Sequence, residues 1–252
     1  MRVFEFGTFR SLARRASATL GAITLLAGCG RDGSGGAGGT VIIGSGQDPQ
    51  SLFPPSAANV VAREVYEQLF QRLADRGIAL NTLGDSGYVP RLAQRWEWSA
   101  DSLRITFHLD PRARWQDGHP VSAADVKFAF DVYTDSLVGS RERAGLRAAM
   151  DSISVGDSVT CTAWFRQRSP EQFDALVTSV IPLPVHLLGT MRRDSLATSS
   201  FARAPVGNGP FKFVRWEQPV RLEIARSDTY NGPRASLDRV IWLFAPDAST
   251  LF

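Results

Sequence analysis

The chain has little of the side chains that usually build reactive sites. Its 252 residues include three histidines and two cysteines. The histidines, His108, His119 and His186, lie far apart, with no i, i+4 pair and no cysteine or acidic ligand at metal-binding spacing. The sequence therefore predicts no metal site and no cofactor.

Recognisable catalytic motifs are also missing. The stretch "VIIGSGQDP", Val41 to Pro49, resembles the start of a dinucleotide-binding loop, but that fingerprint needs a third glycine three places after Gly46. Proline stands there instead, and its ring pushes Asp48 out of helical space. No Gly-x-Ser-x-Gly elbow occurs, and the carboxylates are scattered. We expect no catalytic residue and no enzyme activity.

An excess of charge is missing as well, once the first 28 residues are set aside. Those residues hold four of the 28 basic side chains and one of the 25 acidic ones, so 24 of each remain (28 − 4 and 25 − 1). No basic stripe with interleaved aromatic residues follows. A nucleic-acid partner is therefore not expected.

The N-terminal region reads as an export signal. A basic start precedes the apolar run "ASATLGAITLLAG", which is too short to cross about 30 Å of hydrocarbon. The tetrapeptide Leu-Ala-Gly-Cys that ends at Cys29 resembles the lipobox of bacterial lipoproteins. We predict a signal peptide over residues 1–28, lipidation of Cys29 and a Gly/Ser-rich tether over residues 29–39. Cys161, the only other cysteine, is expected to be a small buried hydrophobe.

Hydrophobic spacing predicts an α/β to α+β fold, built on a covered sheet, from residue 40 onward. The expected elements are a helix face (Val61, Val65, Leu69, Leu73), an alternating strand (103–109), a helix opened by a capping box of Ser122 and Asp125, a hairpin turning at Gly156-Asp157, two strands about Gln218-Pro219, and a strand covered on both faces (240–244). Hairpins outnumber strand-helix-strand crossovers in this pattern.

Five segments in one order resemble the family 5 extracellular solute-binding proteins, the peptide- and nickel-binding receptors of ABC importers. The densest segment is "LAQRWEWSADSLRITFHLDPRARWQDGHPVSAADVKFAFD". The others are "VYEQLF", the Leu-Pro-x-His-Leu-Leu pattern at 183–188, "PVGNGPFKFVRW" and "LDRVIWLFAPDAST". The resemblance implies a type II periplasmic-binding-protein-like fold. Residues 40–252 would form the first lobe with its small subdomain, truncated at the hinge, with the second lobe largely absent.

The resemblance also implies where a ligand would bind. In this family the first strand runs into a loop on the cleft side of the first lobe, which makes Ser45, Gly46 and Gln47 candidate ligand-binding residues. Asn208 and Gly209 are second candidates. The alternative is that both segments are structural turns only.

The implied role is that of a lipid-anchored binding protein on the extracytoplasmic, periplasmic side of a membrane. Its partners would be a peptide or similar small solute, the permease subunits of an ABC importer, and the membrane through the lipid anchor. One lobe cannot bury a ligand on both sides, so we expect this chain alone to bind its solute weakly. The alternative is a truncated, non-transporting lipoprotein that acts as an interaction or sensor module.

Overall fold

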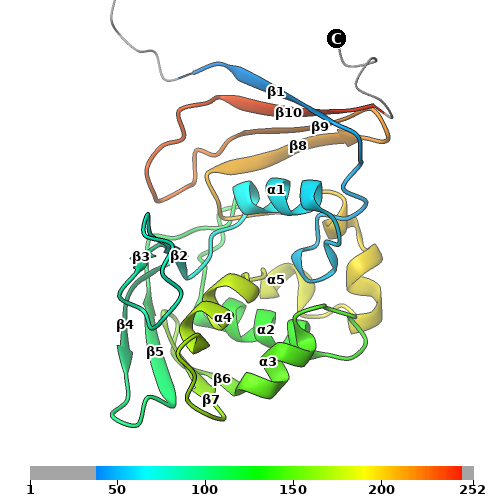
Figure 1. Ribbon diagram of the computed structural model, residues 1–252. Coiled ribbons are helices and arrows are strands. Elements are labelled where there is room, and N and C mark those ends of the chain that lie inside the picture. The colour runs from blue at the N-terminus through cyan, green and yellow to red at the C-terminus, as the bar shows by residue number, and fades with distance from the viewer. Residues whose placement is uncertain (1–37, 246–252) are drawn as a thin grey trace, which may run out of the picture. The chain divides into compact units, whose positions relative to one another are not determined.

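Three β-sheets organise residues 38–245, the part of the chain that the computed structural model describes (Figure 1). The predicted signal peptide, Cys29, most of the tether and the last seven residues lie outside this part. The strands are β1 Thr40–Ser45, β2 Ala74–Arg76, β3 Tyr88–Pro90, β4 Ala93–Trp98, β5 Arg104–Leu109, β6 Met150–Asp157, β7 Thr160–Phe165, β8 Phe211–Glu217, β9 Arg221–Arg226 and β10 Arg239–Phe244. The helices are α1 Val60–Leu69, α2 Ala123–Thr134, α3 Arg143–Ala149, α4 Gln172–Ser179 and α5 Val185–Leu188, with 3-10 turns at Pro54–Ser56, Arg193–Thr198 and Ser200–Ala202.

The first sheet has the order β1-β10-β9-β8 and joins the two ends of the described chain. Strand β1 runs parallel to β10 in a register from Thr40 opposite Arg239 to Ser45 opposite Phe244. The other two pairings are antiparallel. Because parallel neighbours end at the same edge of a sheet, Ser45 and Ala245 lie side by side there, and the N–H of Ala245 donates to the carbonyl oxygen of Ser45 at 3.0 Å.

The prediction that residues 240–244 are covered on both faces is only half right. Val240 and Trp242 are buried, whereas Ile241 is half-buried. Ile241 lies opposite Glu223, which is 1% exposed and is paired with Arg215 at 2.9 Å and with Arg239. Charged side chains thus cover part of this outer face in place of a second apolar layer.

The second sheet is antiparallel with the order β4-β5-β7-β6, and α2 packs against β6 and β7. The predicted strand at 103–109 is confirmed as β5. The predicted hairpin is confirmed as β6 and β7, but it turns two residues later than expected, because β6 continues through Gly156 to Asp157. Cys161 lies on β7 and is 1% exposed, so the prediction that it is a small buried residue is confirmed. Burial raises the pKa of its thiol to about 12.

Helix α2 begins where the capping box predicts. The N–H of Ser122 donates to Oδ2 of Asp125 at 2.7 Å, which satisfies a donor at the helix start. The face of α2 that carries Val126, Phe130 and Tyr133 is buried. Among residues 38–245, none of the helices combines the length and apolar character that a bilayer crossing demands.

Helix α1 ends earlier than its sequence pattern predicts. The apolar spacing continues to Leu73, but the last helical residue is Leu69. The N–H of Gly209 donates to the carbonyl oxygen of Leu69 at 2.8 Å, in the place of an N–H from the next helical turn. A segment distant in sequence therefore ends this helix.

Candidate functional site

The loop that follows β1, Ser45–Gln47, presents its backbone at the edge of the first sheet. Oγ of Ser45 donates to the carbonyl oxygen of Gln47 at 3.0 Å and accepts from the N–H of Gln47 at 3.2 Å. These two bonds hold residues 45–47 in a tight turn. Gly46 and Gln47 are exposed and Ser45 is half-buried. Among residues 38–245, a Cβ added to Gly46 would meet only the carbonyl oxygen of Ala245, at 3.9 Å. The loop is open to a ligand.

Asp48 fixes this loop to the rest of the lobe. Its Oδ2 accepts from Nε1 of Trp216 at 2.9 Å and its Oδ1 accepts from Nε2 of Gln218 at 2.8 Å. Its carbonyl oxygen accepts from Nδ2 of Asn59, the residue that caps α1, at 2.8 Å. The sequence reasoning used Asp48 only to reject a dinucleotide loop and missed this anchoring role, since its partners are distant in sequence.

Asn208 and Gly209 lie in the interior of the lobe. Oδ1 of Asn208, a residue 2% exposed, accepts from the N–H of Gln71 at 2.9 Å. A Cβ on Gly209 would lie 2.7 Å from the carbonyl oxygen of Gln68. The structure gives both residues a packing role against the end of α1, and their ligand-binding role stays a prediction.

Two adjacent hollows lie beyond the end of α1. One has a volume of about 320 Å³ and the other of about 380 Å³, and both have Gln71, Arg91 and Tyr230 in their walls. Oε1 of Gln71 and Nδ2 of Asn208 are buried without a hydrogen-bond partner among residues 38–245. Neither hollow includes residues 45–47, so the candidate ligand loop is separate from them.

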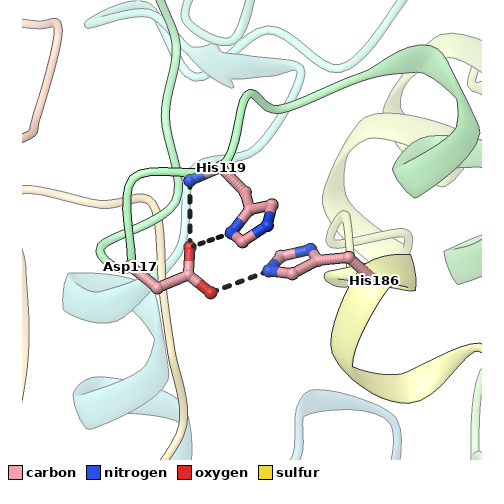
Figure 2. Close-up of side chains that lie close together, drawn as sticks. All are labelled: Asp117, His119 and His186. Carbon is pink, nitrogen blue, oxygen red and sulfur yellow. Dashed lines mark hydrogen bonds and ion pairs between the residues drawn. The ribbon is translucent and has the colours of Figure 1, made fainter.

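Asp117, His119 and His186 form a cluster that the sequence reasoning missed (Figure 2). Nε2 of His186 lies 2.7 Å from Oδ2 of Asp117, and Nδ1 of His119 lies 3.4 Å from Oδ1. The two imidazole rings stack with centroids 4.2 Å apart and an interplanar angle of 22°. Each residue offers one ligand atom, and these atoms lie within 4.8 Å of one another. Two of the three histidines, far apart in sequence, thus meet in space.

The local structure explains how this cluster forms. Gly118, with φ of +93°, turns the chain between Asp117 and His119, and the N–H of His119 donates to Oδ1 of Asp117 at 3.1 Å. Partial burial raises the pKa of Asp117, but hydrogen bonds from His186 and from the His119 N–H outweigh it and hold the pKa below its usual value. The carboxylate is therefore ionised at neutral pH and is a ready ligand for a cation.

Buried Asp125 aligns the two segments that carry the cluster. Its Oδ2 accepts from Nε1 of Trp115, two residues before Asp117, at 3.3 Å. Its Oδ1 accepts from the N–H of Val185, which precedes His186, at 2.8 Å. One carboxylate on α2 therefore holds both the turn and α5. Both segments belong to the family pattern in the sequence, but nothing in the sequence indicated that residues 117 and 186 are partners.

The fold and these segments define an extracellular solute-binding protein. The model of the family "Bacterial extracellular solute-binding proteins, family 5 Middle" matches residues 87–252, and the chain belongs to this family. The family resemblance inferred from the sequence is thereby confirmed.

Individual relatives agree with this family membership. A candidate ABC transporter peptide-binding protein of Brucella ovis is 34% identical over 162 residues, which cover 64% of this chain and 29% of the relative. The dipeptide-binding protein DppE of Bacillus subtilis is 25% identical over 218 residues, 81% of this chain and 38% of the relative. The chain thus spans well under half the length of these curated relatives.

A solved structure shows the fold. The oligopeptide-binding protein AppA of Bacillus subtilis, in complex with a nonapeptide, superposes with a TM-score of 0.77 at 22% identity. The superposition covers 85% of this chain and 41% of AppA. The mixed α/β fold is that of the type II periplasmic binding proteins, as predicted, and this chain matches part of it.

Proposed function

We propose that this chain forms the first lobe of an extracytoplasmic solute-binding protein that captures peptides for an ABC importer. The observation that carries the proposal is the exposed loop Ser45–Gln47 at the edge of the first sheet. The family membership supports capture of a solute, and the names of the Brucella ovis and Bacillus subtilis relatives support a peptide.

The proposed contacts are hydrogen bonds to the peptide main chain. Gly46 has no side chain, and a ligand can approach its backbone closely. The backbone N–H and C=O groups of Gly46 would pair with an extended peptide, as a sheet edge does in β-augmentation. A complete receptor closes a second lobe over the ligand by hinge motion and shields these bonds from water. One lobe leaves them exposed to competing solvent, which weakens them.

We expect this chain to bind tri-L-alanine weakly and at the loop. Calorimetric titration should show no saturation up to about 1 mM peptide, a limit that corresponds to roughly 4 kcal/mol of binding free energy. Amide chemical shifts in an NMR titration should move at residues 44–48 and stay constant in the interior loop 207–209. Tight binding in the calorimeter would contradict the single-lobe argument. Shifts elsewhere, or none, would contradict the proposed site and favour an interaction or sensor module.

A pair of glycine variants separates ligand contact from folding. Gly46→Val places a branched side chain where only one atom lies within 4 Å, so we expect an unchanged melting temperature and the loss of the peptide-induced shifts. Gly145→Val is the matched control, because a Cβ at Gly145 meets nothing within 4 Å and α3 is remote in sequence from the loop. That variant should retain the shifts.

The proposal includes a membrane anchor at Cys29 and a permease partner. The basic start, the apolar run and the lipobox-like tetrapeptide support lipidation. In bacteria that make the full chain, we expect mass spectrometry to find an acylated N-terminus at Cys29 in the membrane fraction. Cys29→Ser should abolish the acylation, whereas Cys161→Ser, which removes the buried thiol, should retain it. An unmodified wild-type Cys29 would exclude the anchor.

A further inference from the structure

We propose that Asp117, His119 and His186 form a binding site for one divalent transition-metal ion of the zinc type. The site lies on the turn before α2 and on α5, outside the loop Ser45–Gln47 that we assign to the solute. It is therefore independent of the proposed peptide-binding function. A bound ion would tie the turn at residues 117–119 to α5.

The donor set fits such an ion. Two imidazole nitrogens and one carboxylate oxygen are ligands that Zn²⁺ and its first-row neighbours prefer, whereas Mg²⁺ and Ca²⁺ prefer oxygen ligands alone. Three protein ligands leave a fourth tetrahedral position for a water molecule. The carboxylate of Asp117 lies beside the two stacked rings, and each of its oxygens faces a nitrogen of one ring (Figure 2).

The geometry needs a rotation of His119, because stacked rings do not point their nitrogen lone pairs at one ion. Bonds of about 2.0–2.2 Å to one ion place ligand atoms no more than about 4 Å apart, and here all three lie within 4.8 Å. The side chain of His119 is 59% exposed, so it can rotate out of its stack with His186 without disturbing the interior. His186 and Asp117 are more fixed, with side chains 22% and 27% exposed. These two supply a preformed pair, and His119 completes the site.

The first experiment is a calorimetric titration of the full chain with ZnCl₂ at pH 7.5. We expect one equivalent to bind, and His119→Gln and His186→Gln each to weaken binding by at least about tenfold, the scale on which metal sites respond to lost support. His108→Gln is the matched control, because His108 lies on β5 beside Glu97 and outside the cluster. All variants retain Cys29, so any binding at its thiol is common to them.

Two further readouts make the test specific. Zn²⁺ should raise the melting temperature of the wild type and of His108→Gln but not of His119→Gln, because an ion that binds only the folded state stabilises it. The electron paramagnetic resonance spectrum of bound Cu²⁺ should show coupling to two imidazole nitrogens, reduced to one in His119→Gln. MgCl₂ should produce no binding heat.

The competing interpretation is a plain hydrogen bond between Asp117 and His186 that joins the turn to α5. In that case Zn²⁺ would give no saturable binding, or the binding would be the same in His119→Gln as in His108→Gln. Either result would overturn the proposal. His119 is exposed, so a folding defect would not obscure the comparison.

Discussion

Asp125→Ala is expected to lower the free energy of unfolding by about 3 kcal/mol, a large share of the 5–15 kcal/mol of a typical domain. The side chain is 1% exposed and accepts from Ser122, Trp115 and Val185. Alanine leaves the buried indole N–H of Trp115 and the half-buried backbone N–H of Val185 without an acceptor, and a buried donor that loses its acceptor costs about 1–3 kcal/mol. Equilibrium unfolding in urea measures the loss.

Asp131→Ala is the control for this prediction. Asp131 lies on the same helix, but its side chain is 42% exposed and contacts Lys127 at 2.6 Å in an i, i+4 pair. Such pairs contribute about 0.2–0.5 kcal/mol, so this variant should unfold almost as the wild type does. Equal losses for the two aspartates would show that Asp125 does not align the turn and α5. A separate readout is the zinc titration, in which Asp125→Ala should weaken binding without removing a ligand.

Gly207→Ala is expected to destabilise the lobe by at least about 3 kcal/mol, the upper part of the range for overpacked interiors. A Cβ on this residue would lie 1.9 Å from the carbonyl oxygen of Leu69. That oxygen belongs to the backbone at the end of α1 and cannot turn aside as a side chain does. Gly207 is also bound to Gln116 through its N–H at 2.9 Å and its carbonyl oxygen at 2.8 Å. Thermal unfolding monitored by circular dichroism measures the effect.

Gly145→Ala provides the matched control for the glycine change. Gly145 lies in α3, and a Cβ there meets nothing within 4 Å. Alanine in a helix is favoured over glycine by roughly 0.8–1 kcal/mol, so this variant should be as stable as the wild type or more so. If Gly207→Ala behaved in the same way, the close approach of the loop to α1 would not exist in solution.

Local signals in the sequence predicted most of the elements. The alternation in residues 103–109 and the capping box of Ser122 and Asp125 depend on neighbours in the chain, and both are confirmed. The errors arose where distant segments decide the outcome. Helix α1 ends at Leu69 because Gly209 bonds to it, and one face of β10 is covered by the ion pairs of Glu223.

The same difference between local signals and contacts of distant segments applies to the candidate sites. The sequence indicated the loop Ser45–Gln47 because a strand, two glycines and a family pattern lie together there. Gly46 and Gln47 are exposed, and the ligand-binding role of the loop stays a prediction. Asn208 and Gly209 share those local signals, yet their contacts with α1 bury them. The cluster of Asp117, His119 and His186 could not be predicted, because it depends on how α5 returns to the turn before α2.

The parallel pairing of β1 with β10 also sets an order of events on the ribosome. Thr40 pairs with Arg239, so the partner of β1 is translated 199 residues later (239 − 40), which takes about 10–40 s at 5–20 residues per second. During that interval the nascent chain holds an unpaired apolar strand, a template for association with other chains. For a chain that is exported as proposed above, this strand stays unpaired until β10 has also crossed the membrane, so a holding chaperone would be useful throughout that time.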